Sequence, residues 1–432
     1  MLTKFTPYSH KTILIAIQLC ITLLFCNSQV NNLVPTLVSD TSNSSLHNKV
    51  TLNTRFEKIK IPLLKINNEK RLWVLPAVAW NNYDKTQVGL MIGVEQKNKY
   101  RILAIPMYGT GSKNLTGIFN SEVFLPTKSS KINASLGLNG KRFTYLLFPE
   151  DLAYNKLSPF VTISPQLGFK GQLNLYFKHQ SIWQEYVLNG RKTQYFQLNT
   201  LGAEHLLENG KLGVKSSGDL LLGKQFATFT LKSDFVLKYQ KKPGNALYLS
   251  AFAGTFLYNN RSNSNINAPL PVFQLSGSSN NGLYWLQKDF GFNDFYFDRN
   301  GIDPFLRRQQ APSEGGFKSL ISAGNSNNFL FAVNLKSDLL FPMKLKRILN
   351  IQPFINIASS KNRNNKAEWY AEGGMSLGFW NDILSFHIPF ATTNNIKLNQ
   401  STAYGIDKRD WPKRVTFSLD LIALKNKLGV RN

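Results

Sequence analysis

The sequence predicts an all-β fold, a transmembrane antiparallel β-barrel of about 16 strands. Three observations favour it. Apolar and polar residues alternate with a period of two along segments of ~9–12 residues, the length that a tilted strand needs to cross a bilayer. Aromatic residues lie near the segment ends, as in the belts at membrane interfaces. Short turns also alternate with long polar loops, as outer-membrane barrels require.

The composition excludes several other classes. Of the 432 residues, 43% are hydrophobic, which is far too many for a disordered tail. Two cysteines cannot build a disulfide scaffold. The 51 basic and 25 acidic residues give a net charge of +26, which by itself suggests nucleic acid or an anionic membrane surface as a partner.

The first 28 residues predict a secretory signal peptide. Basic residues precede an apolar run over 12–26, and the small polar residues Asn27 and Ser28 follow it. A single anchor helix is the alternative, although the run is shorter than the ~20 residues that span a bilayer. Both cysteines, Cys20 and Cys26, lie in this segment, so the mature chain would have none. Residues 29–70 predict a periplasmic lead-in or tether, and 71–432 the barrel.

The strand pattern can be followed along the barrel region. Within 173–177, 227–239, 329–339, 368–379 and 415–421, one face is apolar and the other is polar or charged. Aromatic residues near strand ends are Trp73, Trp80, Tyr239, Tyr258, Trp369, Trp380 and Trp411.

Turn signals separate the strands. Short connections of the hairpin type are predicted at Asn139-Gly140, Asn189-Gly190, Asn209-Gly210, Pro243-Gly244-Asn245 and Asn381-Asp382. Long polar loops are predicted at 259–282, 290–328 and 391–412.

The charged faces predict a solvated lumen. If the apolar face of each strand meets lipid, the charged residues between point inward, where they can pair with one another. The lumenal charges predicted in this way are Lys232, Asp234, Lys336, Asp338, Glu368 and Glu372.

Two motifs carry a family resemblance. The stretch Leu75–Asp84 and the following Val88–Gly93 resemble the opening hairpin of the barrel attached to some secreted gluzincin-type aminopeptidases of Gram-negative bacteria. That barrel is similar to the surface-antigen and outer-membrane insertase superfamily. The resemblance implies a loop folded back into the lumen, here 290–328. Its signature would be Glu314, Gly315, Gly316, Phe317 and Lys318, with Gly315 at the usual arginine position and Lys318 or Arg307-Arg308 as substitutes.

The catalytic and periplasmic modules of these relatives have no counterpart in the sequence. No His-Glu-x-x-His motif occurs, and Glu204-His205 has no second histidine four residues on, so no zinc site is predicted. No phosphate-binding or dinucleotide motif is evident, so no cofactor or metal is expected.

A barrel-embedded hydrolase is the alternative from another class. Outer-membrane phospholipases place serine and histidine two residues apart on one strand face, so that base and nucleophile meet. Two such pairs occur, His179 with Ser181 and Ser385 with His387. Neither pair has the Gly or Asn neighbours expected of an oxyanion hole. An ordinary lumenal or rim histidine is therefore the favoured interpretation of both.

The sequence thus predicts an exported, non-catalytic barrel of the bacterial outer membrane that serves transport, anchoring or partner docking. Basic residues cluster in loops and turns, where they can meet phosphates of membrane lipid and lipopolysaccharide, and Lys/Asn-rich genome composition offers a second explanation of the charge. A periplasmic protein partner, including a separately encoded peptidase, is another expectation. Nucleic acid is not expected as a partner, because export separates the protein from most nucleic acid of the cell.

Overall fold

A computed structural model describes the barrel region of the chain. The described residues are 63–65, 70–81, 84–96, 98–126, 132–146, 152–165, 171–187, 190–239, 245–260, 273–276, 308, 310, 314–321, 323–339, 348–361, 366–380, 382–407 and 410–419. The predicted signal peptide and most of the predicted tether lie outside them, so the boundaries at 28/29 and 70/71 stay predictions. The unit that contains the sheet begins at Leu63.

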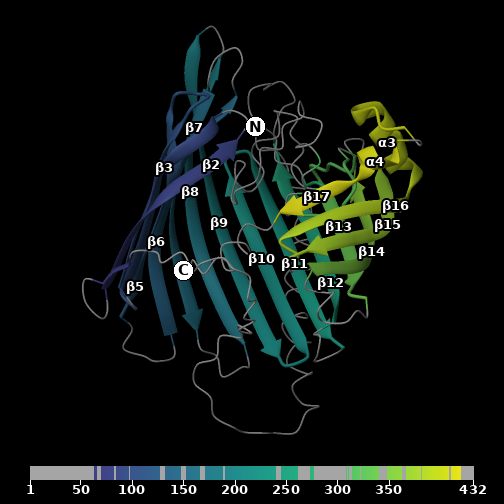
Figure 1. Ribbon diagram of the computed structural model, residues 1–432, viewed down its shortest axis with the longest axis horizontal. Helices are drawn as coiled ribbons and strands as arrows, with labels where there is room; N and C mark the ends of the chain where they lie inside the picture. The colour runs from purple at the N-terminus through teal and green to yellow at the C-terminus, as the bar shows by residue number, and fades with distance from the viewer. Residues whose placement is uncertain are drawn as a thin grey trace, which may run out of the picture. The chain divides into compact units, whose positions relative to one another are not determined.

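The fold is one antiparallel sheet in which each strand pairs with the next along the chain (Figure 1). Its strands are β1 (Leu63–Lys65), β2 (Lys70–Asn81), β3 (Lys85–Gln96), β4 (Tyr100–Gly109), β5 (Leu115–Leu125), β6 (Ile132–Leu146), β7 (Leu152–Pro165), β8 (Gln172–Val187), β9 (Arg191–Asn209), β10 (Leu212–Gly223), β11 (Phe226–Lys238), β12 (Ala246–Asn259), β13 (Phe329–Ser337), β14 (Leu349–Lys361), β15 (Ala367–Phe379), β16 (Leu384–Thr392) and β17 (Thr416–Leu419). The three-residue β1 pairs with the start of β2, and β2 to β17 are the sixteen strands expected. Over the described residues the sheet is not closed into a ring.

The predicted alternation of faces is present on the sheet. Phe177 on β8 and Leu201 on β9 are direct cross-strand partners, and both are more than 40% exposed. On the opposite face, Asn356 and Ala358 of β14 are buried, whereas the neighbouring Ile355 and Ile357 are 55% and 47% exposed. Because side chains of a strand alternate between its faces, one face of the sheet is an exposed apolar surface and the other lines the interior.

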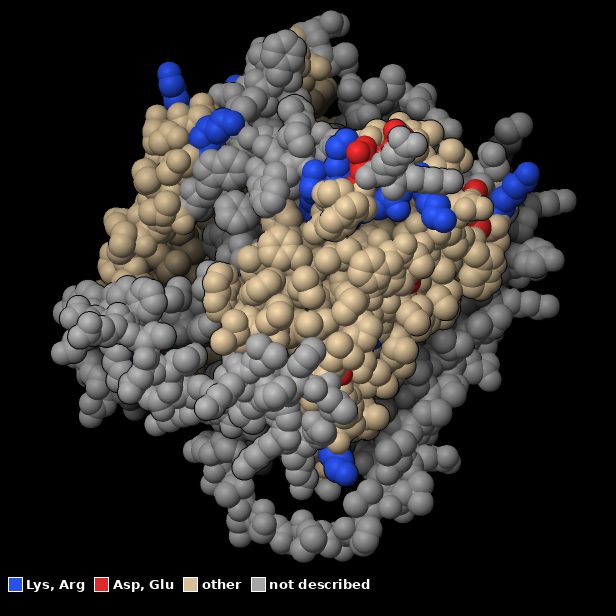
Figure 2. Space-filling view, turned by 45° about the vertical axis from the view of Figure 1, so that its right-hand side comes forward, with Lys and Arg blue, Asp and Glu red and all other residues tan. Residues whose placement is uncertain are grey.

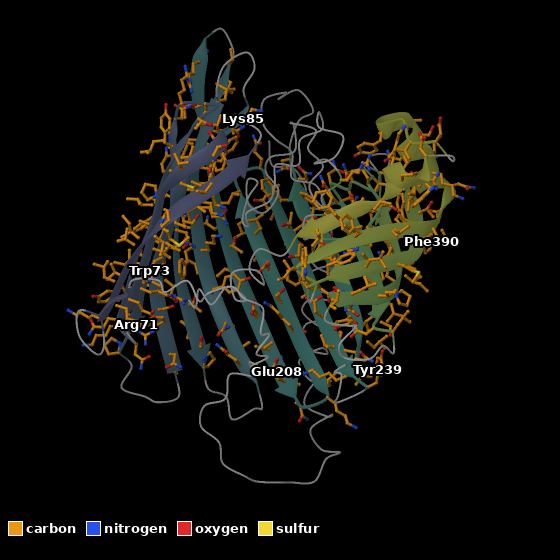
Figure 3. The ribbon with its side chains drawn as sticks, viewed as in Figure 1. Arg71, Trp73, Lys85, Glu208, Tyr239 and Phe390 are labelled. Atoms are coloured by element: carbon orange, nitrogen blue, oxygen red, sulfur yellow. The ribbon has the colours of Figure 1, made fainter. Side chains whose placement is uncertain are left out.

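The exposed apolar side chains recur on nearly every strand. They include Val74, Val78, Val88, Leu90, Ile102, Phe119, Val123, Leu136, Leu157, Ile163, Leu175, Phe177, Leu201, Leu249, Phe331, Leu335, Ile355 and Ile357. Figure 2 brings the side with β13–β17 forward and shows a wall almost free of charge, with Lys, Arg, Asp and Glu gathered at its upper and lower margins. Lys85, Arg71 and Glu208 likewise lie at strand ends (Figure 3).

One of the predicted turn positions was wrong. Asn139-Gly140 lies within β6, because it continues the ladder with Ser158 and Leu157 of β7. The long connection predicted at 391–412 is present between β16 and β17, and it contains two helices, α3 (Asn394–Tyr404) and α4 (Trp411–Arg414). By contrast, Gly190 and Gly210 have positive φ in the tight connections predicted for them. No helix among the described residues is long and apolar enough to cross a membrane.

The aromatic belt is present in part. Trp369, Trp380 and Tyr239 are exposed near strand ends, as predicted. Trp73 is an exception, because its ring covers Gly93, its cross-strand partner on β3, on the inward face. A Cβ at Gly93 would lie 2.0 Å from the indole. Trp73 is therefore an interior packing residue, and the glycine makes room for it.

Candidate functional site

A segment of the long β12–β13 connection lies against the inward face of the sheet. Phe317 and Ile321 of this segment are buried in one apolar cluster with inward residues of four strands. The cluster consists of Phe252, Phe273, Leu275, Phe317, Ile321, Leu330, Ala332, Ala358, Tyr370 and Ile396. We call residues 314–321 the docked segment. It contains all five residues of the signature predicted for an inward loop.

Glu372 of β15 holds the docked segment by its backbone. Its carboxylate accepts hydrogen bonds from the backbone N–H groups of Lys318 and Ser319, the latter at 2.9 Å. The side-chain amide of Asn356 on β14 donates a further bond of 2.6 Å to the same carboxylate. Glu372 is only 2% exposed. A buried carboxylate with three donors is a strong attachment point, because charge-assisted bonds exceed neutral ones.

The carbonyl of Lys318 faces a second attachment point on β17. It accepts bonds from the Thr416 hydroxyl at 2.6 Å and from the Gln310 side-chain amide at 2.9 Å. The backbone N–H of Gln310 in turn donates to the Phe417 carbonyl at 2.6 Å. The backbone of the docked segment is thus bonded to side chains of two strands, Glu372 on β15 and Thr416 on β17.

Two glycines allow the segment to approach the wall so closely. Gly316 has a φ of +69°, and a Cβ there would lie 2.7 Å from the Asn334 amide nitrogen on β13. A Cβ at Gly315 would lie 2.7 Å from the Cα of Leu275. The N–H groups of Gly315 and Phe317 donate to the carbonyls of Gln274 and Leu275, at 3.0 and 2.9 Å. Gly315 therefore makes backbone contacts at the position where an arginine was expected.

Replacement of Gly316 tests this close approach. We expect Gly316→Ala to destabilise the docked segment by about 1–2 kcal/mol, because L-residues avoid left-handed φ and the Cβ would meet Asn334. The control is Gly373→Ala on β15, where the nearest atom to a new Cβ is 3.7 Å away. Thermal unfolding of both variants measures the difference. Equal midpoints would contradict the assigned role of Gly316.

The Lys318 ammonium lies in an unfavourable environment within this loop. Removal from water, reinforced by the cations of Lys336 and Lys232, lowers its pKa from 10.5 to about 8 against the opposing influence of Glu372. The docked state therefore binds fewer protons than the released state between pH 8 and 10.5, so docking gains free energy as pH rises through that window.

A lysine-to-methionine change isolates this effect. Between pH 8 and pH 10 we expect the thermal midpoint of the wild type to rise relative to that of Lys318→Met, because only the wild type loses a destabilising charge there. Scanning calorimetry of both proteins at the two pH values gives the comparison. A midpoint difference that does not change with pH would show that Lys318 is already well solvated.

The remaining predicted lumenal charges form separate groups. Lys232 and Asp234 form an ion pair of 3.2 Å on β11, and Lys336 lies 4.8 Å from the centre of the Tyr248 ring. Asp338 accepts bonds from the Ala246 N–H at 3.0 Å and the Gln352 amide at 2.6 Å. Glu368 accepts a bond from the Tyr370 hydroxyl. Among these six charges, Glu372 hydrogen-bonds to the backbone of the docked segment.

Other residues that contact the loop had no signal in the sequence. Thr416 and Gln310 are ordinary polar residues far from Lys318 along the chain, and only the fold brings them together. Arg308, one of the suggested substitutes for the missing arginine, donates instead to the Pro412 carbonyl of α4 at 3.2 Å. Arg307 lies outside the described residues.

The two serine–histidine pairs differ in the structure. His387 is buried on β16 and contacts Ser376 at 2.8 Å and Ser418 at 3.1 Å, while Ser385 Oγ lies 3.5 Å from the Asp382 carbonyl. The pattern Ser385/His387 thus does not correspond to a bonded pair among the described residues. His179 and Ser181 are bonded, at 3.1 Å, on the outward face of β8, where Ser181 itself is buried with only 9% of its surface exposed. No group of acidic, histidine or cysteine residues in the described ranges could hold a metal ion.

Comparisons with known proteins give structural likeness only. No family model and no curated protein matches the chain. Solved structures that resemble it include CdiB from Acinetobacter baumannii (11% identity, TM-score 0.42, 77% of this chain and 58% of that one) and CdiB from Escherichia coli (11%, 0.39, 75% and 59%). BamA from Haemophilus ducreyi lacking POTRA domains 1–3 also resembles it (11%, 0.39, 74% and 72%). The chain thus spans less than two thirds of either CdiB chain, and at such identity the likeness concerns the fold alone.

Proposed function

We propose that the protein is an outer-membrane β-barrel whose lumen is obstructed by the docked segment, and that it serves transport, anchoring or partner docking. The observation that carries the proposal is the apolar outer face. A soluble protein rarely exposes an apolar patch of more than a few hundred Å². Here exposed Val, Leu, Ile and Phe side chains recur on strand after strand, with charge at the margins.

The interior supports a gated or plugged lumen. The docked segment is held by Glu372 and Thr416, and its apolar residues fill the space beside β12–β15. We propose that the docked segment acts by its position in the lumen.

A partner at the periplasmic end belongs to the same proposal. The predicted tether precedes β1, and β2 starts at the end of the sheet that carries the short β3–β4 and β9–β10 turns. In outer-membrane barrels that end faces the periplasm. A separately encoded peptidase, by analogy with the fused barrels, is one candidate partner. Anionic lipid and lipopolysaccharide would meet the basic margins.

Conductance measurements test the obstructed lumen. We expect the purified protein in planar bilayers to show little or no steady current and Glu372→Ala to show frequent openings, because that variant loses the acceptor that holds the docked segment. Large steady conductance in the wild type would contradict the plug. Failure of the protein to insert into any bilayer would contradict the membrane location itself.

A further inference from the structure

The outward face of β8 and β9 carries an ordered, partly buried set of polar side chains that the lumenal function does not use. His179 Nδ1 lies 2.8 Å from Asn199 Oδ1, and His179 Nε2 lies 3.1 Å from Ser181 Oγ. Ser181 Oγ is 3.0 Å from the Tyr195 hydroxyl, which accepts a 2.6 Å bond from the Gln197 amide. We call these five residues the outer-face cluster.

With a neutral imidazole, one placement of hydrogens satisfies all of these contacts. The Asn199 oxygen can only accept, so His179 carries its proton on Nδ1 and leaves Nε2 as an acceptor. Ser181 then donates its hydroxyl proton to Nε2 and accepts one from Tyr195. Tyr195 in turn accepts from Gln197. A serine that donates to a histidine oriented by a third group is the arrangement of an activated nucleophile.

The position of the cluster along the strands is equally specific. Cross-strand partners on this face run from Phe177 with Leu201, through His179 with Asn199, to Trp183 with Tyr195. Apolar side chains therefore end at His179, and an aromatic pair with ring centroids 5.3 Å apart follows. Trp and Tyr mark the water–lipid interface in membrane proteins, so the cluster lies at the level where ester groups of membrane lipids are found.

The connections between the strands indicate in which leaflet of the membrane the outer-face cluster lies. The β8–β9 connection lies at the same end of the antiparallel sheet as the long β12–β13 and β16–β17 connections, since every second connection returns to one end. Long loops are extracellular in outer-membrane barrels. The cluster would thus face the outer leaflet. One strand away, in the row of Trp183, Asn155 accepts a 2.8 Å bond from Arg142, a cation suited to a lipid phosphate.

We propose that Ser181, His179 and Asn199 form a catalytic triad that hydrolyses a carboxylic ester of an outer-leaflet lipid. The proposal rests on the membrane location above and goes beyond the lumenal function. It also departs from the sequence-based expectation of no catalysis, which rested on the lack of Gly or Asn neighbours for an oxyanion hole. Ser181 and His179 are the reacting residues. Asn199 is a positioning residue. Tyr195 takes the role of oxyanion donor that Gly or Asn neighbours would otherwise fill.

The reaction balances without a cofactor. Ser181 Oγ attacks the ester carbonyl carbon while its proton passes to His179 Nε2, and the Tyr195 hydroxyl stabilises the oxyanion. Collapse breaks the carbon–oxygen bond, and the departing lipid alkoxide takes the proton from Nε2. Water, deprotonated by His179, then attacks the acyl-serine ester and releases a fatty acid. The net change is one ester and one water to one alcohol and one acid.

A fluorophosphonate probe tests the nucleophile directly. The folded, detergent-solubilised protein should form a covalent Ser181–phosphorus bond with loss of fluoride. Ser181→Ala and His179→Ala should each lower the labelling rate by roughly 10³-fold or more. Asn199→Leu should lower it by about tenfold or more, whereas Asn199→Asp, which keeps an acceptor for Nδ1–H, should restore most of it. A merely structural role of Asn199 would not give that rescue.

Matched controls and lipid assays complete the design. Ser121→Ala on β5 removes a hydroxyl that contacts the Leu138 carbonyl on β6, and it should leave labelling unchanged. Fatty-acid release is then measured with the protein in phosphatidylethanolamine–phosphatidylglycerol vesicles and in lipopolysaccharide aggregates, to distinguish the source of the ester. Release in either arm that Ser181→Ala abolishes supports the proposal. A folded wild type that neither labels nor releases fatty acid, or labelling that survives Ser181→Ala, overturns it.

This test is separate from the test of membrane location. A water-soluble protein that labels at Ser181 would refute the outer-membrane function and retain the triad. A membrane-inserted protein that does not react with the probe would refute the triad and leave the outer-membrane function standing.

Discussion

An arginine placed on the outer face should prevent stable insertion. Leu201 is 48% exposed on the middle of β9, beside Phe177. If this face meets lipid, Leu201→Arg should cost about 2–4 kcal/mol, the penalty for a basic residue at the midplane of a transmembrane barrel. In water the same change would add a solvated charge to an exposed site and cost almost nothing. Urea unfolding from lipid vesicles measures the free energy of unfolding.

The matched control puts the same residue on the other face. Ser217 of β10 is the direct partner of Glu204 on β9 and Lys232 on β11, and its side chain points to the interior. We expect Ser217→Arg to be tolerated, since a charge in a polar lumen can be hydrated and can pair with Glu204. If Leu201→Arg and Ser217→Arg had the same stability, the outer face would not be in contact with lipid.

Removal of the Glu372 carboxylate should release the docked segment. Glu372→Ala leaves the N–H groups of Lys318 and Ser319 and the Asn356 amide without their acceptor in a buried site. Orphaned buried donors cost ~1–3 kcal/mol each, so the docked state should weaken by roughly 3 kcal/mol, about a hundredfold in the population of released loop. The apolar cluster around Phe317 would then be the main remaining attachment.

A single cysteine can report this release. The predicted mature chain has no cysteine, and Ser319 is fully buried with a hydroxyl that makes no hydrogen bond to the described residues. Maleimide should therefore label Ser319→Cys slowly, and Glu372→Ala should accelerate labelling. The control is Glu368→Ala, a like carboxylate on the same strand whose bond is to Tyr370. Equal acceleration by both variants would show that Glu372 has no special hold on the loop.

The sheet was predictable from local pattern because its energetics are local. Each strand has one face in an apolar environment and one in a polar environment, so period-two alternation is required at every step. That rule located β8, β11, β13 and β15. It failed at Asn139-Gly140, because an Asn-Gly pair can also continue a strand where its partners on β7 leave room for it.

Contacts between distant segments were not predictable in the same way. The glycines at 315 and 316 indicated an unusual backbone, but their partners, Leu275 and Asn334, depend on how the loop folds back. Likewise the spacing of His179 and Ser181 indicated a shared face, whereas Asn199 and Tyr195 follow only from the β8–β9 register. One residue of slip would move Asn199 to the opposite face.

The most direct test of the central claim is the electrophoretic behaviour of the protein recovered from a fractionated Gram-negative cell. A sixteen-strand barrel with an apolar outer face should appear in the outer-membrane fraction. In detergent it should migrate differently before and after boiling, because the intact sheet resists unfolding by detergent alone. Recovery from the soluble periplasmic fraction, with the same mobility before and after heating, would contradict the account.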